Sequence, residues 1–122
     1  MRAVIYTRTG SSANGDSRRQ LERCREVAAE RGWEVIAAYA DESVSAWNTD
    51  RPGLSAAMDL VRGHGCEILI ADALSVLTRR ASDMESILAD ADAAGVAVHA
   101  EPFSSPDATD RAALRIMYEA RS

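Results

Sequence analysis

The sequence of 122 residues contains no lysine, because all 14 of its Lys and Arg residues are arginine. A phosphate-binding P-loop needs a lysine, so that class of nucleotide site is excluded, and so is chemistry through a lysine Schiff base. Positive charge is not in excess either, since 19 acidic residues give a formal net charge of −5. A domain that grips DNA unaided is normally basic. If nucleic acid is a partner, most of the binding affinity has to come from outside this segment.

Cysteines and long apolar runs are also scarce. Cys24 and Cys66 are far apart and have no second pair, so neither a zinc site nor a disulfide framework is indicated, and we expect both to be small buried hydrophobic residues. No apolar run approaches the ~20 residues of a membrane span. The N-terminus enters a strand directly, without a signal peptide. These features predict a cytoplasmic protein with no membrane segment, metal or cofactor.

Short apolar runs alternate with helical patterns along the whole chain. The predicted strands are 2–6, 33–40, 66–71 and 96–100, and the predicted helices are 17–31, 51–62, 82–94 and a last one from Ser105 onward. This alternation predicts one α/β domain over residues 1–122, with a mostly parallel sheet flanked by helices on both faces. Functional residues in such folds lie at the carboxyl ends of the strands.

Arginines recur at these strand ends and at one helix start. Arg8 follows the first strand, Arg51 begins the second helix and Arg79 follows the third strand. Three converging guanidinium groups could neutralise a phosphodiester and the extra charge of its transition state. Arg51 alone could equally be a helix-start residue paired with a carboxylate such as Asp50. Only the joint pattern predicts an anion site.

Longer stretches of the sequence carry a more specific signal. They are RAVIYTR at the start, Gln20 and Cys24 in the first helix, RGWEV, DESVS, DRPGL, EILIADALSVLTR and AAGVAVHAEP. In order and spacing this pattern resembles the catalytic domain of the serine recombinases, the resolvases and DNA invertases, over nearly the whole chain. The resemblance implies a three-layer resolvase-type domain with four to five strands. In that family a serine attacks the DNA backbone and forms a phosphoserine link, arginines hold the scissile phosphate, and synapsed dimers exchange strands.

The family's site residues carry over unevenly. The family pattern Tyr-x-Arg-x-Ser reads YTRTG at residues 6–10, so Gly10 stands at the nucleophile position. The pattern Asp-Arg-Leu-Ser-Arg reads SVLTR at residues 75–79, so Ser75 and Val76 replace an acidic residue and an arginine. The resemblance retains Arg8, Arg51 and Arg79 as phosphate-binding residues and Tyr6, Gln20 and Ser45 as supporting residues, although Ala46 follows Ser45 where the family usually has glycine. These departures predict a domain with impaired cleavage.

Two other functions stay open. Ser11 or Ser12 could replace the nucleophile if the loop absorbs a shift of ~3.8 Å per residue. The domain could instead be a non-enzymatic dimerisation or regulatory module. Gln20 also has a local alternative, because SRRQ at residues 17–20 fits a capping box. A receiver domain shares the β-α alternation but needs acidic residues after the first strand and a late lysine, and neither is present.

The resemblance also predicts partners. DNA would be bound through a domain that is not present in this chain. In the family the last helix is longer and builds the dimer, so residues 105–122 read as a truncated form of it. Leu114, Met117 and Tyr118 would share one face of this helix and Ile116 would lie roughly opposite. A helix that is apolar on two sides has to bury both faces, one against its own domain and one against a second subunit. This predicts a weak homodimer through this segment.

Overall fold

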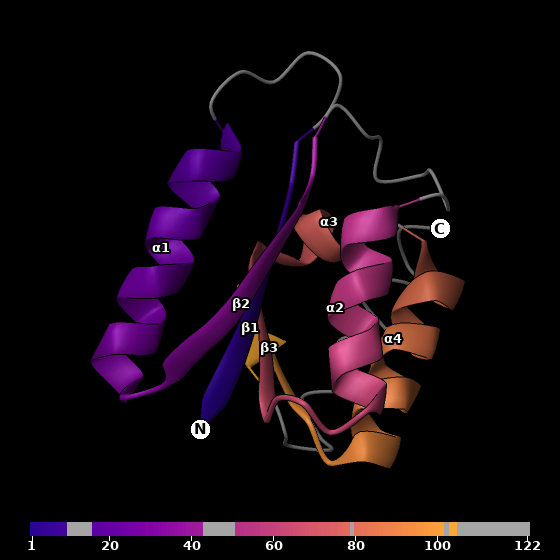
Figure 1. The fold of residues 1–122 in the computed structure, drawn as a ribbon. Coiled ribbons are helices and arrows are strands. Elements are labelled where there is room, and N and C mark those ends of the chain that lie inside the picture. Colours follow the sequence, from indigo (N-terminus) through magenta and orange to yellow (C-terminus); the bar gives the residue numbers. More distant parts are fainter. Residues whose placement is uncertain (10–15, 43–50, 79, 102, 105–122) are drawn as a thin grey trace.

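The computed structural model describes residues 1–9, 16–42, 51–78, 80–101 and 103–104 (Figure 1). Five sites predicted from the sequence, Gly10, Ser11, Ser12, Ser45 and Arg79, lie outside the described residues, as does the segment 105–122. Within the described ranges the elements are β1 (Arg2–Arg8), α1 (Asp16–Arg31), β2 (Glu34–Asp41), α2 (Pro52–Arg62), β3 (Ile68–Ala73), α3 (Leu74–Leu77), α4 (Ala81–Ala94), β4 (Ala97–Glu101) and β5 (Phe103–Ser104).

The strands form one sheet in the order β2-β1-β3-β4-β5. The first four are parallel to their neighbours, and β5 runs antiparallel to β4. Helix α1 covers one face of the sheet, while α2 and α4 lie side by side on the other (Figure 1). This is the three-layer, mostly parallel α/β fold that the sequence predicts, and it places the ends of β1, β2 and β3 at one edge.

Each face of the sheet has its own core, because side chains along a strand alternate between the two faces. On β1, Ala3 and Ile5 pack toward α1, whereas Val4 and Tyr6 belong to the cluster beneath α2 and α4. The central strands are therefore buried on both sides, as expected of a parallel sheet covered by helices. Cys24 and Cys66 are buried and unpaired, which confirms their predicted role as small core residues.

The element boundaries differ from the sequence prediction in a few places. The third strand begins at Ile68, two residues later than expected, and α4 begins one residue earlier, at Ala81. Helix α4 ends at Gly95, which has a left-handed φ of 70° and so favours glycine. The short α3 was not expected, and the fifth strand, which the expected four to five strands allow, had no predicted position, since four and two residues carry no periodicity of their own. No helix in the described ranges has the length and apolar character needed to span a membrane.

Candidate functional site

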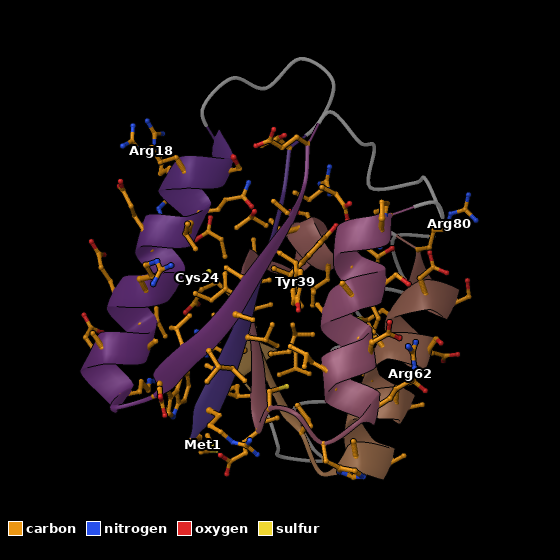
Figure 2. All side chains as sticks on the ribbon, viewed as in Figure 1. Met1, Arg18, Cys24, Tyr39, Arg62 and Arg80 are labelled. Carbon is orange, nitrogen blue, oxygen red and sulfur yellow. The ribbon has the colours of Figure 1, made fainter. Side chains whose placement is uncertain are left out.

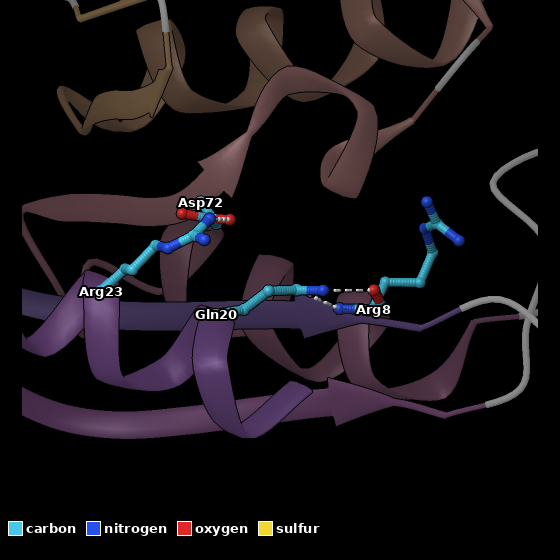
Figure 3. Close-up of polar contacts among 4 residues, drawn as sticks. All are labelled: Arg8, Gln20, Arg23 and Asp72. Atoms are coloured by element: carbon cyan, nitrogen blue, oxygen red, sulfur yellow. Dashed lines mark hydrogen bonds and ion pairs between the residues drawn. The ribbon is translucent and has the colours of Figure 1, made fainter. Parts of the chain in front are cut away.

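Arg8 is the last residue of β1, and its backbone is held in place by Gln20 from α1. The Arg8 N–H donates to Gln20 Oε1 at 3.0 Å, and Gln20 Nε2 donates to the Arg8 carbonyl at 2.9 Å. The Arg8 side chain points away from Gln20, as Figure 3 shows. The next residue, Thr9, donates its N–H to the Asp41 carbonyl at 3.0 Å. The strand end that leads toward Gly10 is thus fixed on both sides.

This arrangement gives Gln20 a role other than helix capping. Both ends of its amide are occupied by the Arg8 backbone, so the capping-box interpretation is wrong. Ser17, the expected cap, lies inside α1 and donates its hydroxyl to Glu42 Oε1 at 3.3 Å. One helical turn beyond Gln20, Arg23 pairs with Asp72 at 2.9 Å and ties α1 to β3 (Figure 3).

The Arg8 guanidinium reaches the short helix α3. Its Nη2 donates to the Ser75 carbonyl at 2.9 Å, and its Nε donates to the Val76 carbonyl at 3.3 Å. Carbonyls in the last turn of a helix have no partner within the helix, so they are natural acceptors for a cation. Arg8 therefore connects the end of β1 to α3 through the backbone of Ser75 and Val76.

Arg51 reaches the same acceptor from the other side. It is the N-cap residue of α2, is only 5% exposed, and donates from Nη1 to the Val76 carbonyl at 3.5 Å. Its guanidinium carbon lies 5.9 Å from the centre of the Tyr6 ring. Two of the three predicted arginines thus share one acceptor atom, while Arg79 lies outside the described residues. Cations held this close repel one another and attract an anion.

Asp41, which the sequence reasoning did not single out, organises the other half of this edge. It is buried, accepts the Tyr6 hydroxyl at 2.7 Å, and accepts the backbone N–H groups of Gly53 at 2.8 Å and Leu54 at 3.0 Å. Because these N–H groups lie in the first turn of α2, Asp41 caps that helix from the end of β2. The available signal was its position as the acidic residue directly after the second predicted strand, 33–40.

Burial and this hydrogen bond also define the chemistry of Tyr6. Burial first, and then the hydrogen bond to Asp41, raise the pKa of Tyr6 well above its usual range. The phenol therefore stays protonated as a donor and is not available as a nucleophile. Its role here is to donate a hydrogen bond to Asp41 and to make a cation–π contact with the Arg51 guanidinium. Across the described ranges, no three His, Cys, Asp or Glu residues gather in a way that could hold a metal ion.

The parallel sheet and the arginines at its carboxyl edge define an α/β domain of resolvase type. Residues 3–121 match the family described as "Resolvase, N terminal domain", and the chain belongs to that family. Its fold is the serine recombinase catalytic-domain fold.

Solved structures agree with this assignment. The N-terminal catalytic domain of TP901-1 integrase is similar with a TM-score of 0.82 and 20% identity, over 98% of this chain and 92% of that one. The C-terminal catalytic domain of ISC1926 TnpA, an IS607-like serine recombinase, gives 0.77 and 27%, over 96% and 79%. A resolvase family site-specific recombinase from Streptococcus pneumoniae gives 0.76 and 20%, over 98% and 89%. No curated protein matches the chain in sequence.

Proposed function

We propose that this chain is a serine recombinase domain that has kept a phosphate-binding edge and lost DNA strand cleavage. The observation that carries the proposal is the shared contact of Arg8 and Arg51 with the Val76 carbonyl. The two cations remain together, but the segment they contact lacks the family's acidic residue and one arginine, and glycine stands at position 10. The edge can attract a phosphodiester, while the groups that would attack it and stabilise its transition state are missing.

Loss of the nucleophile has a direct chemical consequence. Attack on phosphorus needs an oxygen nucleophile in line with the leaving group, held to within roughly 1 Å. Glycine offers no such oxygen, and the protonated, buried Tyr6 does not replace it. Ser11 and Ser12 are the remaining candidates in the loop, and their use would make the domain an active recombinase. That alternative would still lack the acid at position 75 and the arginine at position 76.

Trapping a covalent adduct tests the loss of cleavage. Nicked DNA duplexes of randomised sequence retain the phosphoserine intermediate, and mass spectrometry after nuclease digestion locates it on the protein. We expect no adduct on the parent chain and none on Gly10→Ser, and an adduct only when Gly10→Ser, Ser75→Asp and Val76→Arg are combined. An active serine recombinase on its own nicked site controls the trapping chemistry. An adduct on the parent that disappears with Ser11→Ala or Ser12→Ala would establish the active alternative.

Phosphate binding at the arginine edge is tested separately. Titration with inorganic phosphate, followed through the arginine Nε–H resonances by NMR, should shift Arg8 and Arg51. The variant Arg51→Gln should weaken this response about tenfold or more, because a charge-assisted contact is lost. Arg19→Gln, which removes the same charge from an exposed position on α1, serves as the matched control and should leave it unchanged. Equal loss in both variants would mean that only overall charge matters.

The partners belong to the same proposal. Because the chain carries a net charge of −5, DNA affinity would come from a basic domain outside this segment, in a cytoplasmic protein. Self-association would be weak and would run through residues 105–122. Sedimentation velocity over a concentration series should show dimer only at high concentration, and Leu114→Asp with Ile116→Asp should abolish it. A strict monomer at every concentration would contradict the homodimer.

A further inference from the structure

A groove of about 200 Å³ lies between α2 and α4, on the face of the sheet opposite α1. Its apolar lining comes from Leu54 and Met58 of α2 and Ile87 of α4, and Ser55 and Ser86 add one hydroxyl from each helix. Sites for drug-sized ligands measure about 300–1,000 Å³. The smaller volume therefore restricts the groove to a ligand with few heavy atoms.

Four charged side chains line the groove, two of each sign, and two of them neutralise each other. Arg62, labelled in Figure 2, extends from α2 and pairs with Asp90 of α4 at an Nε–Oδ2 distance of 3.1 Å. The other two are Arg51 and Asp83. Neither has an ion-pair partner among the described residues. Among the described residues, the one hydrogen bond from the Arg51 side chain is 3.5 Å long, beyond the usual range, although the residue is only 5% exposed.

A buried cation without a contacting anion is costly, and a ligand that supplies the anion recovers that cost. A purely anionic ligand would pair with Arg51 but would bring its negative charge close to Asp83. A purely cationic ligand would pair with Asp83 but would be repelled by Arg51. The lining as a whole carries no net charge, so it fits a ligand that also carries one charge of each sign. The apolar side chains between the helices require an apolar body as well.

We propose that this groove binds a small zwitterion of the α-amino acid class with an apolar side chain. The carboxylate pairs with Arg51, the ammonium group with Asp83, and the side chain packs against Met58 and Ile87. Charge complementarity and size carry the assignment. The site does not depend on DNA or on strand cleavage. It shares Arg51 with the proposed phosphate site, so a bound amino acid would compete with phosphate there.

Three related probes separate the two charges. Leucine carries both charges, N-acetylleucine lacks the ammonium group and leucinamide lacks the carboxylate. In titrations to about 10 mM followed by backbone amide shifts, leucine should shift residues of α2 and α4, and each derivative should bind about tenfold more weakly or worse. If leucine caused no shifts, the proposal would be overturned. Equal binding of N-acetylleucine also overturns it, because the groove would then recognise a chain's terminal carboxylate.

Two variants with one control tie the response to the groove. Ser86→Leu fills the space between the helices and should abolish leucine binding, while Ser82→Leu makes the same change on α4 at a position outside the lining and should not. Asp83→Asn should remove the preference for leucine over N-acetylleucine. Ser86→Leu should leave the phosphate response of Arg8 intact, so failure of the groove and failure of the phosphate site are distinguishable. Undiminished leucine binding by Ser86→Leu would overturn the assignment.

Discussion

The side-chain amide of Gln20 pairs with the backbone of Arg8 as a neighbouring strand would, accepting its N–H at 3.0 Å and donating to its carbonyl at 2.9 Å. The glutamine is buried, and the partner lies 12 residues earlier in the chain. One helix side chain therefore completes the hydrogen bonding at the end of β1, two residues before Gly10. This contact gives Gln20 a structural role that does not depend on DNA cleavage.

Gln20→Ala should lower the free energy of unfolding by about 1–3 kcal/mol, because it leaves a partly buried N–H and a carbonyl of Arg8 without their Gln20 partner. Arg19→Ala, one residue earlier and exposed, is the matched control and should stay within about 0.5 kcal/mol of the parent. Urea denaturation measures both, with the midpoint moving and the slope constant. Equal midpoints for the two variants would show that Gln20 contributes no more than a surface residue.

Gly53 lies against the end of β2 so closely that a side chain does not fit. A Cβ atom placed there would stand 2.6 Å from the Ala40 carbonyl oxygen, which belongs to the backbone and cannot easily move. Gly53→Ala should therefore cost about 1–3 kcal/mol of unfolding free energy. Gly65→Ala is the matched control: its nearest neighbour, at 2.7 Å, is the end of the flexible Leu60 side chain, so it should cost less. Thermal unfolding of the two variants side by side decides the order, and the reverse order would contradict this reading.

The carboxylate of Asp41 accepts three hydrogen bonds, from the Tyr6 hydroxyl and from two N–H groups at the start of α2. In Asp41→Asn, the amide NH₂ would face one of these donors. We expect a loss of about 1–3 kcal/mol in unfolding free energy. Glu42→Gln makes the same chemical change at the next, exposed residue and should have little effect. Guanidinium denaturation followed by circular dichroism measures the difference, and a neutral Asp41→Asn would show that the cap is dispensable.

Much of the fold could be predicted from the sequence because its signals are local. Helix periodicity, a Pro at the first turn of α2 and a Gly after α4 mark the long elements within one or two residues, and the β-α alternation implies a parallel sheet. The short α3 escaped because four residues give no repeat. The family itself followed from motifs spread along the chain.

The site was only partly predictable, because its contacts join distant residues. The sequence pointed to Arg8 and Arg51, but their common acceptor is a backbone carbonyl, and Arg8 lies 68 positions from Val76. Carbonyl acceptors leave no mark on the sequence. Gln20 fits a local capping pattern in the sequence, but in the structure its side chain bonds to the backbone of Arg8 at the end of β1. Asp41 looked like one of 19 acidic residues until the start of α2 was seen to rest on it.

The free energy of unfolding should depend on pH through the titration of His99 in β4. Its ring is buried, stands edge-on to Trp33 with 6.0 Å between centroids, and has Nε2 at 3.5 Å from Glu101 Oε1. Burial lowers the pKa of His99, Glu101 opposes this shift, and Arg31 adds to it. The unfolded chain, with a histidine pKa near ~6.5, therefore takes up a proton more readily than the folded one.

It follows that the contribution of neutral His99 to stability is complete above about pH 6.5 and is lost as the pH falls through the lower folded pKa. Urea unfolding at a series of pH values between about 7.5 and 5 should show this decline in the parent. His99→Phe should flatten it, because no proton can bind. Glu101→Gln should steepen it, because the one carboxylate known to favour the charged ring is gone. If Glu101→Gln flattened the profile instead, the carboxylate and not the buried ring would control it.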